Sequence, residues 1–157
     1  MKNIDIKKDR LRYTKNTLSS TLAIVAIVFN VLYFVSIYNS DVGNYYYSIN
    51  IGYSILSNLL FLLFTFLSSE GVKNYKYEYS YLLFVLGGFQ ILRIFGIPMD
   101  AHSTYLRIDG KDVLVMDDNQ FIWTLVCLII SAICCFAAAI IGIIKTKTLR
   151  DYEKSLK

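Results

Sequence analysis

The sequence predicts an all-α membrane protein, a four-transmembrane-helix bundle with a short extracellular β-hairpin between helices 3 and 4. Two observations carry this prediction: the chain has four long apolar stretches, and nearly all of its charge lies outside them. Of the 157 residues, 55% are hydrophobic, and the four stretches contain a single charged residue, Arg93. A helix needs roughly 20 apolar residues to cross the hydrocarbon core. Because backbone polar groups must be paired inside lipid, each stretch is expected to be a helix.

The four spans account for most of the chain, which we expect to form a single membrane domain over residues 1–157. Little sequence remains outside the spans, so a separate catalytic domain has no room. The expected segments are, in chain order, spans at about residues 17–38, 48–68, 79–97 and 120–144, flanked by basic cytoplasmic tails at 1–16 and 145–157.

Lysine and arginine are distributed unevenly among the tails and loops. Both tails are rich in these residues and the second loop carries Lys73 and Lys76, whereas the first loop, 39–47, has none. The positive-inside rule therefore places both termini and the second loop in the cytoplasm, as expected of a multi-pass plasma-membrane protein. Attraction to anionic lipid explains the basic tails, so the lipid bilayer is the expected partner and nucleic acid is not. Abundant Lys, Ile, Asn and Tyr suit an AT-rich bacterial genome.

A layer of polar side chains is predicted near the middle of the bundle. It consists of one residue from each span: Asn30, Asn58, Gln90 and Ser131. A carboxamide without a partner in lipid is unfavourable, so these side chains should face one another. Hydrogen bonds of this kind contribute on the order of 0.6 to 2 kcal/mol each. The layer either fixes the register of the helices or forms a hydrated or substrate-binding site.

Arg93 is the one charge inside a span, and an intramembrane charge is a functional hypothesis by default. Gln90 lies three residues before it, on the same helix face. We expect the long side chain to snorkel outward into a structural ion pair. The alternatives are an anion- or ligand-binding arginine, or an arginine that pairs with an acidic residue in a partner's span. Candidate counter-charges are Asp41, Asp100, Asp117 and Asp118.

Small residues recur at helical spacing along the fourth span and define a small-residue face. Such a face lets helix backbones approach closely, either within the bundle or between subunits. We interpret the cysteines as packing residues, and the sequence indicates no metal site and no cofactor. The small-residue face consists of Ser131, Cys134, Cys135, Ala138, Ala139 and Gly142.

The third span is expected to end at Pro98, and a hairpin is expected before the fourth. Two runs rich in β-branched and aromatic residues flank Asp109-Gly110, a pair that suits a two-residue type I′ turn. An isolated hairpin is marginally stable in water, so this one should rest on the helix ends or on a partner. The single histidine, His102, is expected to be a loop residue because one His beside one Asp does not make a metal site.

No motif for nucleotide binding, metalloprotease chemistry or a nucleophile elbow occurs, and the spans hold no carboxylate or histidine for proton coupling. The leading hypothesis is a non-enzymatic accessory, assembly or scaffold subunit that associates with another membrane protein or with itself. Its contacts would be the small-residue face and the hairpin. A large residue at Ala138 or Gly142 would then disrupt a complex without unfolding the bundle. The alternative is a small transporter or channel component that works as an oligomer.

Overall fold

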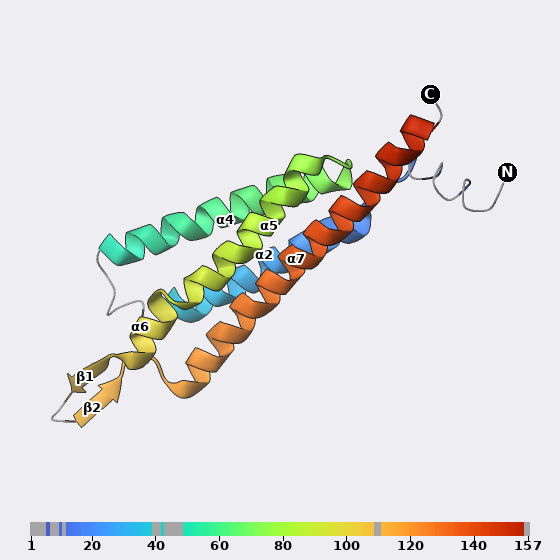
Figure 1. The fold of residues 1–157 in the computed structure, drawn as a ribbon. Coiled ribbons are helices and arrows are strands. Elements are labelled where there is room, and N and C mark those ends of the chain that lie inside the picture. The colour runs from blue at the N-terminus through green and yellow to red at the C-terminus, as the bar shows by residue number, and fades with distance from the viewer. Residues whose placement is uncertain are drawn as a thin grey trace.

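The computed structural model describes residues 6, 10, 12–38, 42, 49–108 and 111–155. Within them, four helical segments are long and apolar enough to cross a membrane, and a two-stranded antiparallel sheet precedes the last (Figure 1). The predicted fold class is confirmed. In chain order the elements are α2 (Thr17–Tyr38), α4 (Ile49–Lys73), α5 (Tyr77–Ile94), α6 (Ile97–Ser103), β1 (Tyr105–Ile108), β2 (Lys111–Leu114) and α7 (Asp118–Ser155).

The long helices run up and down in alternation and form a bundle. Helices α2 and α5 each pack against both α4 and α7, so α4 and α7 stand diagonally opposite each other. The hairpin lies at one end of the bundle, here called the hairpin end. Helix α2 begins and α7 ends at the other, the terminal end (Figure 1). Figure 1 also shows α4 leaning away from α7 towards the hairpin end.

Helix α7 is much longer than the predicted fourth span. Its 38 residues continue to Ser155, so most of the expected tail at 145–157 is helical. At 1.5 Å per residue the helix is about 57 Å long, nearly twice the thickness of the hydrocarbon core. Its final turns therefore extend past the other helices at the terminal end (Figure 1). Helix α4 likewise continues five residues beyond the predicted end at 68, to Lys73.

The third span is broken near its end, which corrects the expectation that Pro98 ends it. Helix α5 stops at Ile94, and after Phe95 and Gly96 the short helix α6 begins, with Pro98 in its first turn. Proline is well tolerated there because its missing N–H would have no partner in the first turn of a helix. Pro98 thus starts a helix rather than ending one.

The hairpin forms where the sequence predicted it and rests on the helix ends. Ile108 pairs with Lys111, which leaves two residues between the strands. Those two, Asp109 and Gly110, lie outside the described residues, so the type I′ turn stays a prediction. After β2, Val115 donates a backbone hydrogen bond to the Thr104 carbonyl, and Val115 and Met116 are buried. These contacts anchor the base of the hairpin.

Two clusters of buried apolar side chains form the core. The terminal-side cluster comprises Ala23, Ala26, Phe61, Val72, Leu83, Leu86, Cys135, Ala138 and Ala139. The hairpin-side cluster comprises Tyr33, Ile37, Val42, Ala101, Val115, Met116, Cys127 and Leu128. The predicted polar layer lies between them.

Candidate functional site

Arg93 is the centre of a hydrogen-bonded network in the middle of the bundle. Its Nη1 donates to Asn30 Oδ1 at 2.7 Å and to Gln90 Oε1 at 2.9 Å, and its Nη2 donates to Asn58 Oδ1 at 2.7 Å. Gln90 Nε2 in turn donates to Asn30 Oδ1 at 3.0 Å and to Ser131 Oγ at 2.8 Å. The side chains of the predicted polar layer therefore meet, and this Arg93 network joins α2, α4, α5 and α7.

The helices position the network through short-range spacing and backbone contacts. Gln90 and Arg93 share a face of α5, as their three-residue separation predicted. Ser131 Oγ donates to the Ala26 carbonyl at 2.9 Å and ties α7 to α2. Asn30 and Gln90 are 0% exposed and Asn58 is 1% exposed. The carboxamides are therefore enclosed by protein, where a hydrogen bond is electrostatically stronger than in water.

The guanidinium of Arg93 points into the bundle, and among the described residues it does not form the expected ion pair with Asp100, Asp117 or Asp118. Among the described residues, Lys73 forms an ion pair with Glu70 and His102 Nε2 lies 3.9 Å from an Asp118 oxygen, and neither contact includes Arg93. Its hydrogen-bond partners are three neutral carboxamides and Tyr33, and its Cζ lies 4.5 Å from the centre of the Tyr33 ring. The physical reason is proximity: three carboxamide oxygens at the depth of Arg93 offer charge-assisted hydrogen bonds.

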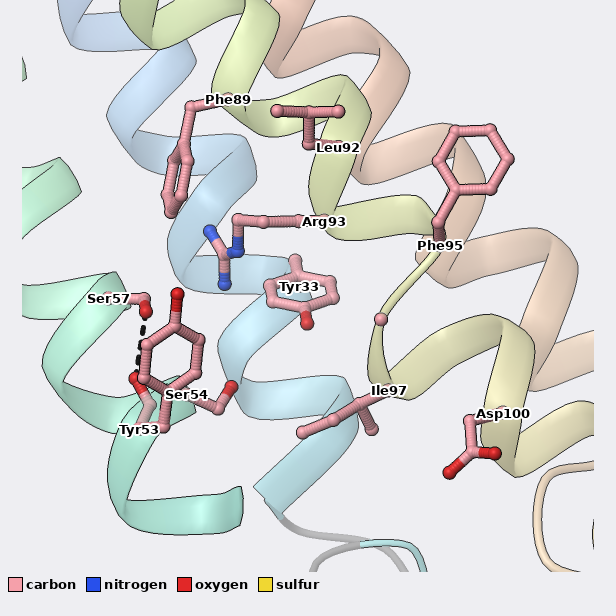
Figure 2. Close-up of a pocket in the computed structure, with 11 residues that line it drawn as sticks. Tyr33, Tyr53, Ser54, Ser57, Phe89, Leu92, Arg93, Phe95, Ile97 and Asp100 are labelled. Atoms are coloured by element: carbon pink, nitrogen blue, oxygen red, sulfur yellow. Dashed lines mark hydrogen bonds between the residues drawn. The ribbon is translucent and has the colours of Figure 1, made fainter.

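The aspartates that were candidate counter-charges for Arg93 either make contacts with other residues or lie apart from its guanidinium. Asp41 lies outside the described residues. Asp117 Oδ1 accepts a hydrogen bond from Gln120 N at 2.7 Å and caps α7, while Asp118 lies 3.9 Å from His102 Nε2. Asp100 is exposed and lies near Arg93, but Figure 2 shows its carboxylate on the far side of Ile97 from the guanidinium.

A pocket of about 560 Å³ lies beside Arg93, between α2, α4 and the break that separates α5 from α6 (Figure 2). Its walls are mainly aromatic and aliphatic, with Ser54 and Ser57 of α4 adding hydroxyl groups. Three lining residues are largely exposed: Tyr53 (71%), Leu92 (68%) and Phe95 (66%). The pocket therefore opens on the outer side of α4 and α5, which faces lipid when the helices span a bilayer.

The sequence pointed to Arg93 and did not reveal this pocket. Tyr53 and Ser54 lie 40 and 39 residues before Arg93 in the sequence, and they line the same pocket only because α4 packs beside α5. The one local signal was Phe89, which precedes Arg93 by four residues, and its ring centre lies 5.8 Å from the Arg93 Cζ. Such a spacing places two side chains on one helix face.

The small-residue face of α7 packs within the bundle. All of its residues are buried except Cys134, which is partly buried against the terminal-side cluster. Gly142 shows how close the helices are, since a Cβ atom there would lie 2.5 Å from Ser80 Oγ and 3.4 Å from Ser19 Oγ. This face is consequently covered by α2 and α5 of the same chain, and the expectation that it contacts a partner has to be revised.

A second group of buried polar residues near the terminal end was not predicted. Ser20 Oγ lies 2.8 Å from Ser69 Oγ, and Ser19 Oγ donates to the Ala138 carbonyl. Closer to the end, Lys145 Nζ donates to Asn16 Oδ1 at 3.0 Å. The serine contacts lie beside the terminal-side cluster, which includes Ala138.

Fold and site together define a multi-pass membrane protein, built on a four-helix bundle with a charged network at its centre. When the chain is compared with protein-family models, curated proteins and solved structures, none of them matches it. The function must therefore be argued from the chain's own geometry.

Proposed function

We propose that this chain is a non-enzymatic membrane protein that works by association within the membrane, as an accessory, assembly or scaffold subunit. The observation that supports this most directly is that apolar side chains close the bundle on both sides of the Arg93 network. The terminal-side cluster covers it on one side and the hairpin-side cluster on the other. A solute that passed through a single copy would have to cross both clusters, so the geometry favours association over conduction.

The hairpin is the best candidate for a partner contact, since the small-residue face is covered within the chain. Figure 1 shows that the hairpin projects beyond the ends of the helices. Tyr105 of β1 is 65% exposed and Val113 of β2 is 47% exposed. Single exposed apolar residues are common on protein surfaces and need no special explanation. These two lie on an element that projects from the bundle, where a second protein can reach them, so they suit a protein contact.

We propose a plasma-membrane location with both termini in the cytoplasm and the hairpin outside. The distribution of Lys and Arg supports this orientation. It also agrees with the path of the chain, because α2 begins and α7 ends at the same end of the bundle (Figure 1).

Site-specific photo-crosslinking tests the proposal. A tagged full-length chain carries a photoreactive residue at Val113 or Tyr105, is irradiated in native membranes and is purified in mild detergent. We expect one stoichiometric product, a partner or a second copy, identified by mass spectrometry. The matched control is Val85, which is 67% exposed on α5 and faces lipid in a spanning bundle. A chain that purifies alone, or equal crosslinking at all three positions, contradicts the proposal.

The alternative, a transporter or channel component that works as an oligomer, draws its support from the pocket beside Arg93. Since that pocket opens on the outer side of α4 and α5, a second copy packed there would complete a polar path. The test is the reaction of a water-soluble thiol reagent with an Asn58→Cys variant in a background without native cysteines. Rapid labelling in membranes favours transport, and protection favours association.

A further inference from the structure

We propose that the pocket beside Arg93 binds a membrane lipid with an anionic headgroup, whose phosphate or carboxylate pairs with the guanidinium. The ligand enters sideways from the bilayer, between α4 and α5. This site is independent of the proposed hairpin contact. It rests on three observations: the charge of Arg93 has no acidic partner among the described residues, the guanidinium keeps one N–H for a ligand, and the pocket opens on the face that lipid would cover.

The first observation is electrostatic. The acceptors that hold Arg93 are the carboxamide oxygens of Asn30, Asn58 and Gln90, which orient the guanidinium without neutralising it. Asp100, the acidic residue that also lines the pocket, does not form an ion pair with it. A cation at membrane depth is unfavourable unless it is paired or hydrated. An anion in the adjoining pocket would supply the missing charge.

The second observation concerns hydrogen-bond donors. A guanidinium has five N–H groups in a fixed plane. The hydrogen bonds to Asn30, Gln90 and Asn58 use three of them, two on Nη1 and one on Nη2. Tyr33 also forms a side-chain hydrogen bond with Arg93, which takes a fourth donor and leaves one N–H of the five for a ligand. A guanidinium N–H forms a strong, charge-assisted hydrogen bond with a carboxylate or phosphate oxygen.

The third observation is access. Tyr53, Leu92 and Phe95 line the pocket and are each more than half exposed, so its mouth faces outward between the helices. Arg93 lies in the last turn of α5, the end of that helix that faces the hairpin, so a headgroup approaches it from the hairpin side of the bilayer. The acyl chains can then lie along the exposed leucines of α4, such as Leu56 and Leu63.

The size of the pocket favours a lipid headgroup over a helix from another protein. A volume of about 560 Å³ falls within the range of small-molecule sites. A helix with its side chains is about 10 Å across, too wide to enter such a pocket. An acidic residue on a neighbouring helix would therefore have to reach Arg93 from outside, past Tyr53.

Asn30→Asp is the decisive variant. Asn30 Oδ1 accepts hydrogen bonds from Arg93 and Gln90, whereas the buried Asn30 Nδ2 has no hydrogen-bond partner among the described residues. Replacing the amide by a carboxylate therefore keeps both hydrogen bonds and supplies a counter-charge within 2.7 Å of Nη1. The matched control is Asn119→Asp, at an exposed position of α7, which changes the net charge equally.

The measurement is fluorescence quenching by brominated lipids. The full-length chain carries Phe95→Trp as reporter at the pocket mouth and Trp123→Phe to remove the native tryptophan, and is reconstituted in phosphatidylcholine vesicles. We expect brominated phosphatidylglycerol or brominated oleate to quench at a mole fraction roughly tenfold lower than brominated phosphatidylcholine, as one charge-assisted hydrogen bond would allow. Asn30→Asp should abolish this preference and Asn119→Asp should keep it. Thermal melting confirms that each variant is folded.

Several results would overturn the proposal. Equal quenching by anionic and zwitterionic lipid means that Arg93 does not select an anion. Equal loss of preference in Asn30→Asp and Asn119→Asp assigns the effect to general surface charge. Displacement of the brominated lipid by millimolar inorganic phosphate would mean that the site takes free anions from water. Quenching that is prevented by a copurifying membrane protein would assign the pocket to a partner's acidic side chain.

Discussion

At the scale of single residues, the network around Arg93 shows how a charge is held inside a membrane bundle by neutral groups. Asn30, Asn58 and Gln90 each offer an oxygen to the guanidinium, and Gln90 also donates to Asn30 and Ser131. Gln90 and Arg93 thus each take part in three of the five hydrogen bonds of the network. In a low-dielectric interior, a network of this kind rigidifies the fold when complete and destabilises it when partly satisfied.

Replacing Gln90 by Leu should therefore destabilise the bundle. The change removes two donated hydrogen bonds and one accepted from Arg93, and it leaves buried polar groups without partners. The expected loss is about 1–3 kcal/mol in the free energy of unfolding. It can be measured by denaturant titration in mixed micelles. Val85→Leu, on the lipid-facing side of the same helix, should leave stability unchanged.

Gly142→Leu should also destabilise the bundle rather than release a partner. A Cβ added at this position would lie only 2.5 Å from Ser80 Oγ, so a leucine side chain would force α7 away from α5 and α2. Overpacking of this kind costs about 1–3 kcal/mol or more. Gly88→Leu is the matched control, because a Cβ at Gly88 meets nothing within 4 Å. A Gly142→Leu variant with unchanged melting that nevertheless loses a companion protein would restore the small-residue face as a partner contact.

At the scale of elements, the connection between α4 and α5 has an unusual residue at its turn. Two backbone hydrogen bonds close the turn after α4. Tyr75 N donates to the Val72 carbonyl at 3.2 Å, and Lys76 N donates to the Gly71 carbonyl at 3.1 Å. Tyr75 has a φ of 58°, the left-handed conformation in which helices usually end on glycine. A side chain in this conformation costs roughly 1–2 kcal/mol.

Tyr75→Gly is accordingly expected to stabilise the protein by up to about 1 kcal/mol, because relief of the backbone strain outweighs the greater flexibility of glycine in the unfolded chain. The same change one residue earlier, Asn74→Gly, should destabilise it, since Asn74 Nδ2 donates to the Glu70 carbonyl at 2.9 Å. Thermal melting of the two variants in one detergent decides the point. A lower melting temperature for Tyr75→Gly would contradict this expectation. It would show that contacts of the Tyr75 side chain stabilise the fold by more than the backbone strain destabilises it.

At the scale of the whole molecule, the bundle is closed inside and extended at both ends. The hairpin projects at one end and the last turns of α7 at the other (Figure 1). Lys147, Arg150 and Lys154 lie in those last turns, where positive charge suits both the end of a helix and an anionic membrane surface. The positive-inside rule uses this concentration of positive charge at one end of the bundle to assign that end to the cytoplasm.

The proposed orientation predicts which end is accessible from outside the cell. In a background without native cysteines, Arg107→Cys in β1 should react with a membrane-impermeant maleimide in intact cells. Lys154→Cys in α7 should react only after permeabilisation, because it lies in the cytoplasm under this orientation. Both side chains are exposed, so a difference in labelling between the two variants would report the side of the membrane and not burial. The reverse pattern would invert the topology.

Features that depend on local composition could be read from the chain. The positions of the four spans follow from apolar length, since lipid requires helices there. The hairpin follows from strand-forming runs around Asp109-Gly110, and the common depth of Asn30, Asn58, Gln90 and Ser131 follows from counting residues. The pairing of Gln90 with Arg93 follows from helical spacing.

Features that depend on how the helices are rotated and which ones are neighbours required the folded molecule. A span that is apolar on all sides carries no periodic signal for its buried face, so the sequence left the small-residue face open to two uses. Arg93 turns inward because carboxamides from α2 and α4 reach it, and the pocket exists because Tyr53 and Phe89 come from different helices. Contacts between helices are long-range, and the positions of single residues do not encode them.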